Sequence, residues 1–256
     1  MPSKRDQERE ELVELIEEIY AASFDTYGSP RIQAEIVSRG LKVSRPRVAR
    51  IMKSEGIQSK IRKKYKVTTD SKHDLNIAPN LLNRKFKVDS PSRVWVSDLT
   101  YINTKEGWLY LTVVIDLYDR KVIGWALSKT MEAKETTISS LKMALNNRVP
   151  LDGLIFHSDR GVQYACSDFV QLLDNFEITQ SMSRKGNCWD NAVAESFFKT
   201  IKVECIYRSE YSSRHRAKMD IFSYIEMWYN RKRRHSSLGY VTPIEMEQLF
   251  YNKKAA

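Results

Sequence analysis

The chain of 256 residues is 42% hydrophobic and 29% charged, which suits one large domain, or a core with a small companion, around a buried interior. No apolar run approaches the roughly 18 to 20 residues of a membrane span, and the polar start lacks the apolar stretch of a secretory signal. Three cysteines without paired spacing argue against a disulfide framework and a structural zinc site, and they favour a reducing cytoplasm.

The N-terminal part has the pattern of short helices. Residues 1–22 predict an amphipathic helix, because apolar side chains recur every four positions from Leu12 onward. Residues 23–57 predict a pair of helices, the first beginning at Pro30 and the second capped by Ser44, with a glycine in the turn between them. This pattern is typical of a helix-turn-helix that binds DNA, and plain packing of a helical hairpin fits it equally well.

Basic side chains are concentrated in one part of the chain. Between residues 29 and 66, twelve lysines and arginines stand against two acids. Such a block attracts a polyanion, since phosphate neutralisation dominates most nucleic-acid affinity; a solvated charged face is the alternative. We expect Arg45, Arg47 and Arg50 to contact DNA. Residues 58–87 have little periodicity, and we interpret them as a basic linker.

Residues 88–252 carry the pattern of an α/β domain. The predicted strands cover residues 94–102, 108–117, 121–127, 154–156 and 178–181. The predicted helices cover residues 132–148, 167–175, 190–207 and 214–231. Three strands followed by alternating helix and strand predict a mixed five-stranded sheet flanked by helices. The predicted fold class is therefore α/β, preceded by the small helical domain.

Three acids are candidates for chemistry. Asp98 lies inside an apolar strand, where burying a carboxylate is costly without a positive partner. Asp159 closes a predicted strand, at the edge of the sheet where ligands of α/β proteins collect. Glu195 lies on a predicted helix and shares a polar face with Lys199 and Lys202. A hard divalent cation is the usual partner of such a set, and Mg²⁺ prefers oxygen ligands.

Each of these acids also has an ordinary structural explanation. Asp98 could accept a hydrogen bond from a neighbouring strand, and Asp159 could form a plain turn. Glu195 could pair with Lys199 on the helix surface, which contributes only a few tenths of a kcal/mol. The three acids carry the prediction only if they converge.

Other acids bear on the choice. Asp116 ends a predicted strand and Asp119 lies in the turn that follows, so both compete as candidate ligands. Asp190 fits the N-cap of the helix that carries Glu195.

Converging carboxylates suit a site with two Mg²⁺ ions about 3.5 to 4 Å apart, with one ion activating the attacking oxygen and the other stabilising the leaving oxygen. In a protein with a formal net charge of +10, this predicts phosphodiester chemistry on a nucleic acid. Asp98, Asp159 and Glu195 are then the catalytic and metal-binding residues. The attacking oxygen could belong to water, giving cleavage, or to a DNA 3′-hydroxyl, giving strand transfer.

Further DNA contacts are predicted around these acids. Arg184 and Lys185 lie in a basic loop before the Glu195 helix, where an ordinary exposed turn is the alternative. Lys199 and Lys202 would hold DNA beside the acids. Arg231 belongs to a second basic cluster at a helix end, where cations also favour the helix dipole.

Several stretches resemble one known family. They are residues 94–102 (VWVSDLTYI), 157–164 (HSDRGVQY), 186–198 (GNCWDNAVAESFF), the tail 229–243 and the helical residues 27–56. These stretches are similar to the motifs of bacterial insertion-sequence transposases of the DDE type, encoded by the second reading frame and carrying a retroviral-integrase-like core.

The resemblance implies an RNase H-like core in which Asp98, Asp159 and Glu195 bind Mg²⁺, with Mn²⁺ as a substitute. Lys202 matches the basic residue seven positions after the family's glutamate. The family cuts and joins element ends on double-stranded DNA as an oligomer, and an upstream frame supplies a further segment, so the chain would act alone or within a fusion. A bacterial protein associated with the nucleoid, and no membrane, are expected.

Two other functions remain open from the residues. The first is a nuclease of the same fold, which would cleave without strand transfer. The second is a DNA-binding regulator without enzymatic activity, in which the acids are structural.

Overall fold

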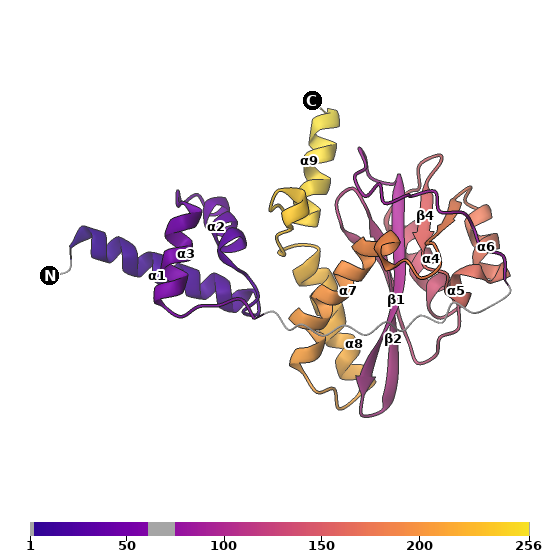
Figure 1. Cartoon of the computed structure of the whole chain (residues 1–256), viewed down its shortest axis with the longest axis horizontal. Coiled ribbons are helices and arrows are strands. Elements are labelled where there is room, and N and C mark those ends of the chain that lie inside the picture. Colours follow the sequence, from indigo (N-terminus) through magenta and orange to yellow (C-terminus); the bar gives the residue numbers. More distant parts are fainter. Residues whose placement is uncertain (1–2, 61–74, 256) are drawn as a thin grey trace. The chain divides into compact units, whose positions relative to one another are not determined.

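The computed structural model describes residues 3–60 and 75–255, which fall into two compact units (Figure 1). One unit contains residues 3–60 and 232–242, and the other contains residues 75–231 and 243–255. Residues 61–74, which hold the end of the basic block and much of the predicted linker, lie outside the described residues.

The first unit is helical, as the sequence predicts, with α1 (Lys4–Ala22), α2 (Ser29–Ser38) and α3 (Arg45–Ser54). Pro30 lies in the first turn of α2. Ser44 caps α3, because its hydroxyl accepts a hydrogen bond from the backbone N–H of Arg47 (3.4 Å). Both predicted helix starts are confirmed. The helices pack on one another and bury Ile16, Ile32, Ile36 and Val48.

Residues 232–242 complete this unit through Arg234. The backbone N–H of Arg234 donates to the Tyr27 hydroxyl (2.7 Å), and its guanidinium donates to Glu35 (2.8 Å) and to Ser38 (2.7 Å). Arg234 is buried. This arginine of the second basic cluster therefore stabilises the helical unit rather than forming an exposed charged surface.

The second unit is built on a five-stranded sheet in the order β3-β2-β1-β4-β5. The strands are β1 (Val94–Thr104), β2 (Gly107–Asp116), β3 (Val122–Ser128), β4 (Ile155–Ser158) and β5 (Thr179–Met182). The pairs β1–β2 and β2–β3 are antiparallel, whereas β1–β4 and β4–β5 are parallel. The predicted mixed five-stranded sheet is confirmed.

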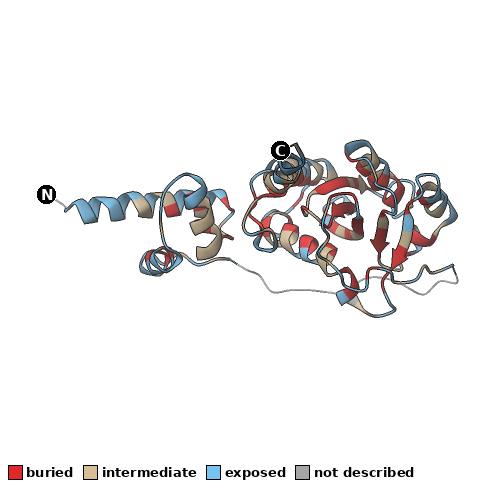
Figure 2. Cartoon of the chain, turned by 90° about the horizontal axis from the view of Figure 1, so that it is seen from above, coloured by how far each residue is buried: buried red, intermediate tan, exposed pale blue. Residues whose placement is uncertain are grey.

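Helices cover both faces of this sheet, so the strands are buried between two layers (Figure 2). On one face lie α7 (Ala192–Glu204), α8 (Arg214–Ser223) and the π-helix η3 (Tyr224–Tyr229). On the other face lie α4 (Thr137–Asn147), α5 (Val162–Ala165) and α6 (Ser167–Asp174). The remaining helices are η1 (Cys188–Asn191), η2 (Ile206–Arg208), α9 (Pro243–Ala255) and, in the first unit, η4 (Ser236–Leu238).

Strand β1 alternates between the two cores, as its period of two requires. Val94 and Val96 belong to the core on the α7 side, and Trp95 belongs to the core on the α4 side. Asp98 continues the Val94–Val96 series, so it lies on the face that α7 covers. This placement of Asp98 follows from the pattern in the sequence.

The structure corrects several predicted elements. Helix α4 begins at Thr137 instead of residue 132, because residues 133–136 form turns. The predicted helix 190–207 is divided into η1, α7 and η2. Helices α5 and α9 were not predicted. No helix among the described residues is long and apolar enough to cross a membrane.

Candidate active site

Two of the predicted acids lie on neighbouring strands. In the parallel β1–β4 pair, Val96 lies opposite His157. Continuing this register by two residues brings Asp98 level with Asp159, which directly follows β4. Adjacent strands are about 4.8 Å apart, so the two carboxylates start from neighbouring backbone positions.

Local hydrogen bonds orient both aspartates. Oδ1 of Asp98 accepts from the backbone N–H of Leu99 (2.8 Å), and Oδ1 of Asp159 accepts from the backbone N–H of Gly161 (2.9 Å). Both residues are half-buried. Asp159 thus forms the turn that was the alternative explanation for it. The turn does not rule out a ligand role, because it uses one carboxylate oxygen and the carboxylate has a second.

Glu195 lies in the first turn of α7, the helix that packs against β1. The side-chain amide of Asn191, just before α7, donates to the Ser97 carbonyl (3.0 Å), which fixes the start of the helix beside Asp98. Burial raises the pKa of the Asp98 carboxyl well above its ordinary value, and the charges of Asp159 and Glu195 raise it further. Asp98 is therefore influenced by the charges of both other acids.

Of the two predicted lysines on α7, one lies beside the acids. Lys202 is half-buried, which lowers the pKa of its ammonium group, while the nearby charge of Asp98 acts in the opposite direction. Lys199 is exposed. The structure thus brings Lys202 to the acids and leaves Lys199 at the surface.

Buried polar side chains support the two strands from behind. The Tyr164 hydroxyl and the Ser97 hydroxyl are 2.7 Å apart. Both ring nitrogens of His157 contact serine hydroxyls, Nδ1 that of Ser181 (2.9 Å) and Nε2 that of Ser183 (3.2 Å). Burial lowers the pKa of His157 to about 4, so the imidazole is neutral at pH 7 and serves as a hydrogen-bonding link between β4 and β5.

Asp190 does not cap α7, which corrects the sequence prediction; the N-cap position belongs to Asn191. Asp190 is instead fully buried in a cluster of donors that we call the Asp190 clamp. Its oxygens accept from Arg184 Nε (2.9 Å) and NH2 (2.8 Å), from Arg84 Nε (2.9 Å) and from Asn80 Nδ2 (2.9 Å). Two arginines donate charge-assisted hydrogen bonds to this carboxylate. Such bonds stabilise a buried charge more than the backbone N–H groups of a helix N-cap would.

The clamp was not visible in the sequence. Arg84 and Asn80 precede Asp190 by 106 and 110 residues, and they belong to the stretch interpreted as a linker. That stretch also pairs with β5, since the Leu81 backbone N–H donates to the Ser181 hydroxyl (2.9 Å). Residues 75–88 are therefore part of the catalytic unit, with Leu82 buried in its core, although they contain no helix or strand.

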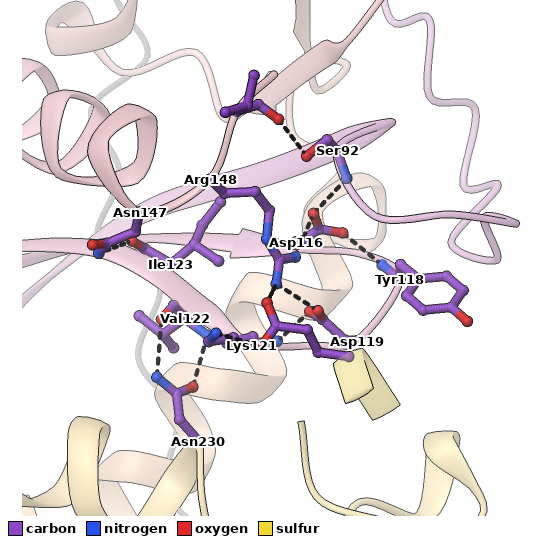
Figure 3. A network of polar contacts seen from close by, with 12 residues as sticks. Ser92, Asp116, Tyr118, Asp119, Lys121, Val122, Ile123, Asn147, Arg148 and Asn230 are labelled. Atoms are coloured by element: carbon purple, nitrogen blue, oxygen red, sulfur yellow. Dashed lines mark hydrogen bonds and ion pairs between the residues drawn. The ribbon is translucent and has the colours of Figure 1, made fainter. Parts of the chain in front are cut away.

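The competing acids Asp116 and Asp119 belong to a separate network, shown in Figure 3. The guanidinium of buried Arg148 forms ion pairs with Asp116 (2.8 Å), Asp119 (2.7 Å) and Glu247 (2.5 Å). Asp116 also accepts hydrogen bonds from Ser92 and Trp95. Their surroundings give these acids a structural role.

The other predicted DNA contacts lie at the surface. Arg45, Arg47 and Arg50 are exposed on α3, and Arg231 is exposed after η3. Lys185 is exposed in the loop before η1. Arg184 is half-exposed but engaged with Asp190, so its charge is largely neutralised within the protein.

The three acids offer a metal-binding donor set, although not yet in ligand geometry. Among residues 3–60 and 75–255, no group of three or more His, Cys, Asp or Glu side chains is arranged to hold a metal ion. The donor chemistry nevertheless fits a hard divalent cation, since the set is all carboxylate. Burial first, and then the charges of Asp159 and Glu195, raise the pKa of Asp98, and a bound cation would offset both effects.

Comparisons with known proteins agree with this arrangement. Residues 88–188 and 176–243 match families described as "Integrase core domain", and residues 7–65 match one described as "HTH-like domain". The chain is 42% identical to "Insertion element IS600 uncharacterized 31 kDa protein" of Shigella sonnei, covering 99% of this chain and 93% of that protein. It is 39% identical to "Transposase InsF for insertion sequence IS3A" of Escherichia coli strain K12, covering 96% of this chain and 85% of that protein.

The fold also has a structural relative. The chain is similar to a chain in "CryoEM structure of simian T-cell lymphotropic virus intasome in complex with PP2A regulatory subunit B56 gamma", with a TM-score of 0.51 and 17% identity. The similarity covers 84% of this chain and 69% of that chain. At this identity it concerns the fold alone.

Fold and family matches together define a polynucleotidyl transferase with an integrase core of the RNase H-like class. The chain belongs to the insertion-sequence transposases of the DDE type. It is thus a DNA transposase, of a class that depends on a divalent metal ion, and the resemblance seen in the sequence is confirmed.

Proposed function

We propose that Asp98, Asp159 and Glu195 are the catalytic residues of this transposase and that together they hold two Mg²⁺ ions, for which Mn²⁺ can substitute. The observation that carries the proposal is the β1–β4 register, which makes Asp98 and Asp159 level neighbours beneath the first turn of α7. Bound cations would lower the pKa of the attacking hydroxyl and stabilise charge on the leaving oxygen.

The reaction that fits this site is transfer of a DNA strand. The oxygen of a 3′-hydroxyl at the element end attacks a phosphorus atom of the target strand and forms a new phosphodiester bond. The bond from that phosphorus to the target's 3′-oxygen breaks, the attacking hydroxyl loses its proton to solvent, and the leaving oxygen gains one. The number of phosphodiester bonds is unchanged. Cleavage of the element end follows the same course, with water in place of the 3′-hydroxyl.

The chain's own residues position the strand in this reaction. Lys202, half-buried beside Asp98, would contact the phosphate nearest the acids, and exposed Lys199 would contact the strand further along. Lys185 and Arg231 are exposed donors for backbone phosphates. Arg184 acts mainly by holding the loop, because Asp190 already pairs with it.

Sequence recognition belongs to the helical unit in this proposal. Arg45, Arg47 and Arg50 lie on α3, the second helix of the predicted helix-turn-helix, and are exposed together. We assign them to the terminal repeats of the element. The domain boundaries expected from the sequence, 1–22, 23–57, 58–87 and 88–252, are kept in this proposal as functional segments, although residues 75–87 pack with the catalytic unit and residues 232–242 with the helical unit.

The proposal includes the partners expected of such an enzyme. It acts on double-stranded transposon ends and target DNA as a homo-oligomer, either alone or joined to the product of an upstream reading frame. Its site of action is the bacterial cytoplasm, at the nucleoid.

A strand-transfer assay tests the proposal. Wild-type protein, Asp159→Asn and the control Asp168→Asn, which changes an exposed acid on α6, are incubated with duplexes carrying the element's terminal repeats in Mg²⁺. We expect Asp159→Asn to lose about 100-fold or more of cleavage and joining while keeping DNA affinity, since it removes a group that stabilises charge in the transition state. Asp168→Asn should match wild type.

Other outcomes would reject the proposal in distinct ways. Hydrolysis without joined product would favour a nuclease of the same fold. Full activity in Asp159→Asn would show that these acids are not the catalytic residues. DNA binding without any metal-dependent cleavage in the wild-type protein would favour a regulator.

A further inference from the structure

Trp189 has no role in the chemistry described so far, yet it lies two residues before Asn191, which bonds to β1 directly before Asp98. Its side chain is 69% exposed, more than any other aromatic side chain that the structure describes. Tryptophan is rarely left in water, because its indole is a large apolar surface. It lies in η1 (Cys188–Asn191), the short helix that leads into α7.

The residues on both sides of Trp189 are fixed. Asn187 accepts a hydrogen bond from Arg84 (2.9 Å), and Asp190 is held in the clamp by Arg84 and Arg184. Asn191 donates to the Ser97 carbonyl (3.0 Å). Hydrogen bonds thus hold the turn at positions 187, 190 and 191, while the indole of Trp189 is exposed to solvent. A rigidly mounted aromatic ring loses little conformational entropy when it binds a flat partner.

The same hydrogen bonds place Trp189 next to the acid site. Ser97, which anchors Asn191, directly precedes Asp98 in β1. Glu195 lies one to two turns further along the chain, in the first turn of α7. A group stacked on the indole would therefore lie at the border of the acids.

The residues next to Trp189 along the chain favour a nucleic acid over a protein partner. Lys185 on the preceding loop is an exposed cation, Gly186 and Asn187 add no apolar surface, and Lys199 is a further exposed cation on the helix that follows. An apolar residue set among charged and polar ones is a poor start for a protein interface, whose centre is depleted of charge. It suits a strand whose backbone is anionic and whose bases present flat faces.

We infer that Trp189 is a stacking platform for an unpaired nucleobase at the DNA end held by the acids. The inference rests on the proposed function, and it adds how the end is gripped. In a closed duplex the bases stack on one another, so the platform requires the terminal pair to open. The indole then replaces the lost stacking partner and keeps the reacting strand aligned with Asp98, Asp159 and Glu195.

DNA affinity in the absence of metal tests the inference without depending on catalysis. Fluorescence anisotropy compares wild type, Trp189→Ala and Trp189→Phe on duplexes that carry the terminal repeat and end in either a paired or a mismatched final base pair. Trp108→Ala is the matched control, because Trp108 is also exposed (49%) but lies at the far end of β2. Thermal melting of each variant shows that the fold is intact.

We expect Trp189→Ala to bind the mismatched end about 5- to 150-fold more weakly than wild type, the loss that removal of one base–aromatic stack produces. Trp189→Phe should keep most of the affinity, and Trp108→Ala should match wild type. Wild-type protein should bind the mismatched duplex more tightly than the paired one, since the terminal base pair of the mismatched duplex is already open.

The inference is wrong if Trp189→Ala binds both ends as tightly as wild type. If sedimentation then shows a smaller oligomer for Trp189→Ala, the indole is covered by a second copy of the chain. This failure is distinct from failure of the proposed function, which is decided by the joining activity of Asp159→Asn.

Discussion

At the scale of single residues, the charge state of each acid follows from what surrounds it. Hydrogen bonds and charge from Arg184 hold the pKa of Asp190 well below its ordinary value of 3.8. Asp98, by contrast, is half-buried, and loss of water around its carboxyl together with the charges of Asp159 and Glu195 raises its pKa. The first environment stabilises a structural charge, and the second is one that a bound cation would stabilise, as the proposed function requires.

The Asp190 clamp gives a stability prediction with a definite pH dependence. Asp190→Asn should lower the free energy of unfolding by about 2 kcal/mol at pH 7, because it removes charge-assisted hydrogen bonds to a buried carboxylate. A carboxyl group whose pKa is lower in the folded state stabilises the fold above its unfolded pKa. That contribution is lost as the pH falls below about 3.8.

Urea unfolding at pH 7 and pH 3 measures this effect. The difference between wild type and Asp190→Asn should shrink by about 1 kcal/mol between the two pH values. If the difference in unfolding free energy is the same at both pH values, the clamp stabilises the fold through packing and neutral hydrogen bonds rather than through the charge of Asp190.

At the scale of elements, Arg148 joins the β2–β3 turn, the end of α4 and helix α9 (Figure 3). Burial raises the pKa of Asp119 to about 6, although the Arg148 guanidinium opposes this rise. Asn230 adds a further link, since its amide donates to and accepts from the backbone of Val122 at the start of β3 (3.0 and 2.9 Å). Side chains thus fasten the edge of the sheet to the C-terminal part.

Removing the guanidinium should be costly. Arg148→Met should lower the free energy of unfolding by about 3 to 5 kcal/mol at pH 8, because Asp116 and Asp119 are left buried without their partner. The pKa of Asp119, already about 6, would rise further. Protonation at lower pH then removes the unpaired charge, so the variant should recover stability between pH 8 and pH 5.

Thermal melting across this pH range is the measurement, with Arg216→Met as control. Arg216 forms an exposed ion pair with Asp220 (3.2 Å), which contributes little. Equal losses in the two variants, or a loss in Arg148→Met that does not depend on pH, would contradict the account.

The mixed five-stranded sheet could be predicted, because it follows from local alternation and from the succession of strands and helices along the chain. The level positions of Asp98 and Asp159 could not, because they depend on the parallel pairing of β1 with β4. From residue patterns alone Asp116 stayed open beside Asp159, and only the resemblance of residues 157–164 to the family's motif selected Asp159. The partner of Asp116 is Arg148, 32 positions later, and no local pattern marks it. The role of Asp190 was misread for the same reason, because its donors Asn80 and Arg84 lie more than 100 residues earlier. Distant ion pairs are set by tertiary structure alone.

At the scale of the whole molecule, neither unit is one continuous stretch of the chain. Residues 232–242 belong to the helical unit, with Arg234 bonded to Tyr27 across 207 positions of sequence. The tail motif resembling the transposase family was recognisable, but its packing partner was not. The helical unit is therefore formed from the N-terminal residues together with residues 232–242, while the residues after 242 return to the catalytic unit.

The basic surface of the helical unit predicts a salt dependence of DNA binding. Replacing Arg45, Arg47 and Arg50 by Gln should reduce the slope of log affinity against log salt by about 2 to 3, since each phosphate contact contributes about 0.9. Arg39→Gln is the control, because Arg39 already forms ion pairs with Glu18 (3.0 Å) and Glu35 (3.2 Å). Anisotropy titrations at several salt concentrations give the slopes. A slope unchanged in the triple variant would remove α3 from the DNA-binding surface.

The central claim is that three distant carboxylates form one cation site. Anomalous diffraction from crystals of the protein with terminal-repeat DNA and Mn²⁺ locates the ions directly. We predict Mn²⁺ peaks bonded to Asp98, Asp159 and Glu195, separated by about 3.5 to 4 Å if both positions are filled. Mn²⁺ bound only at other acids, such as Asp116 and Asp119, with none at these three, would contradict the account.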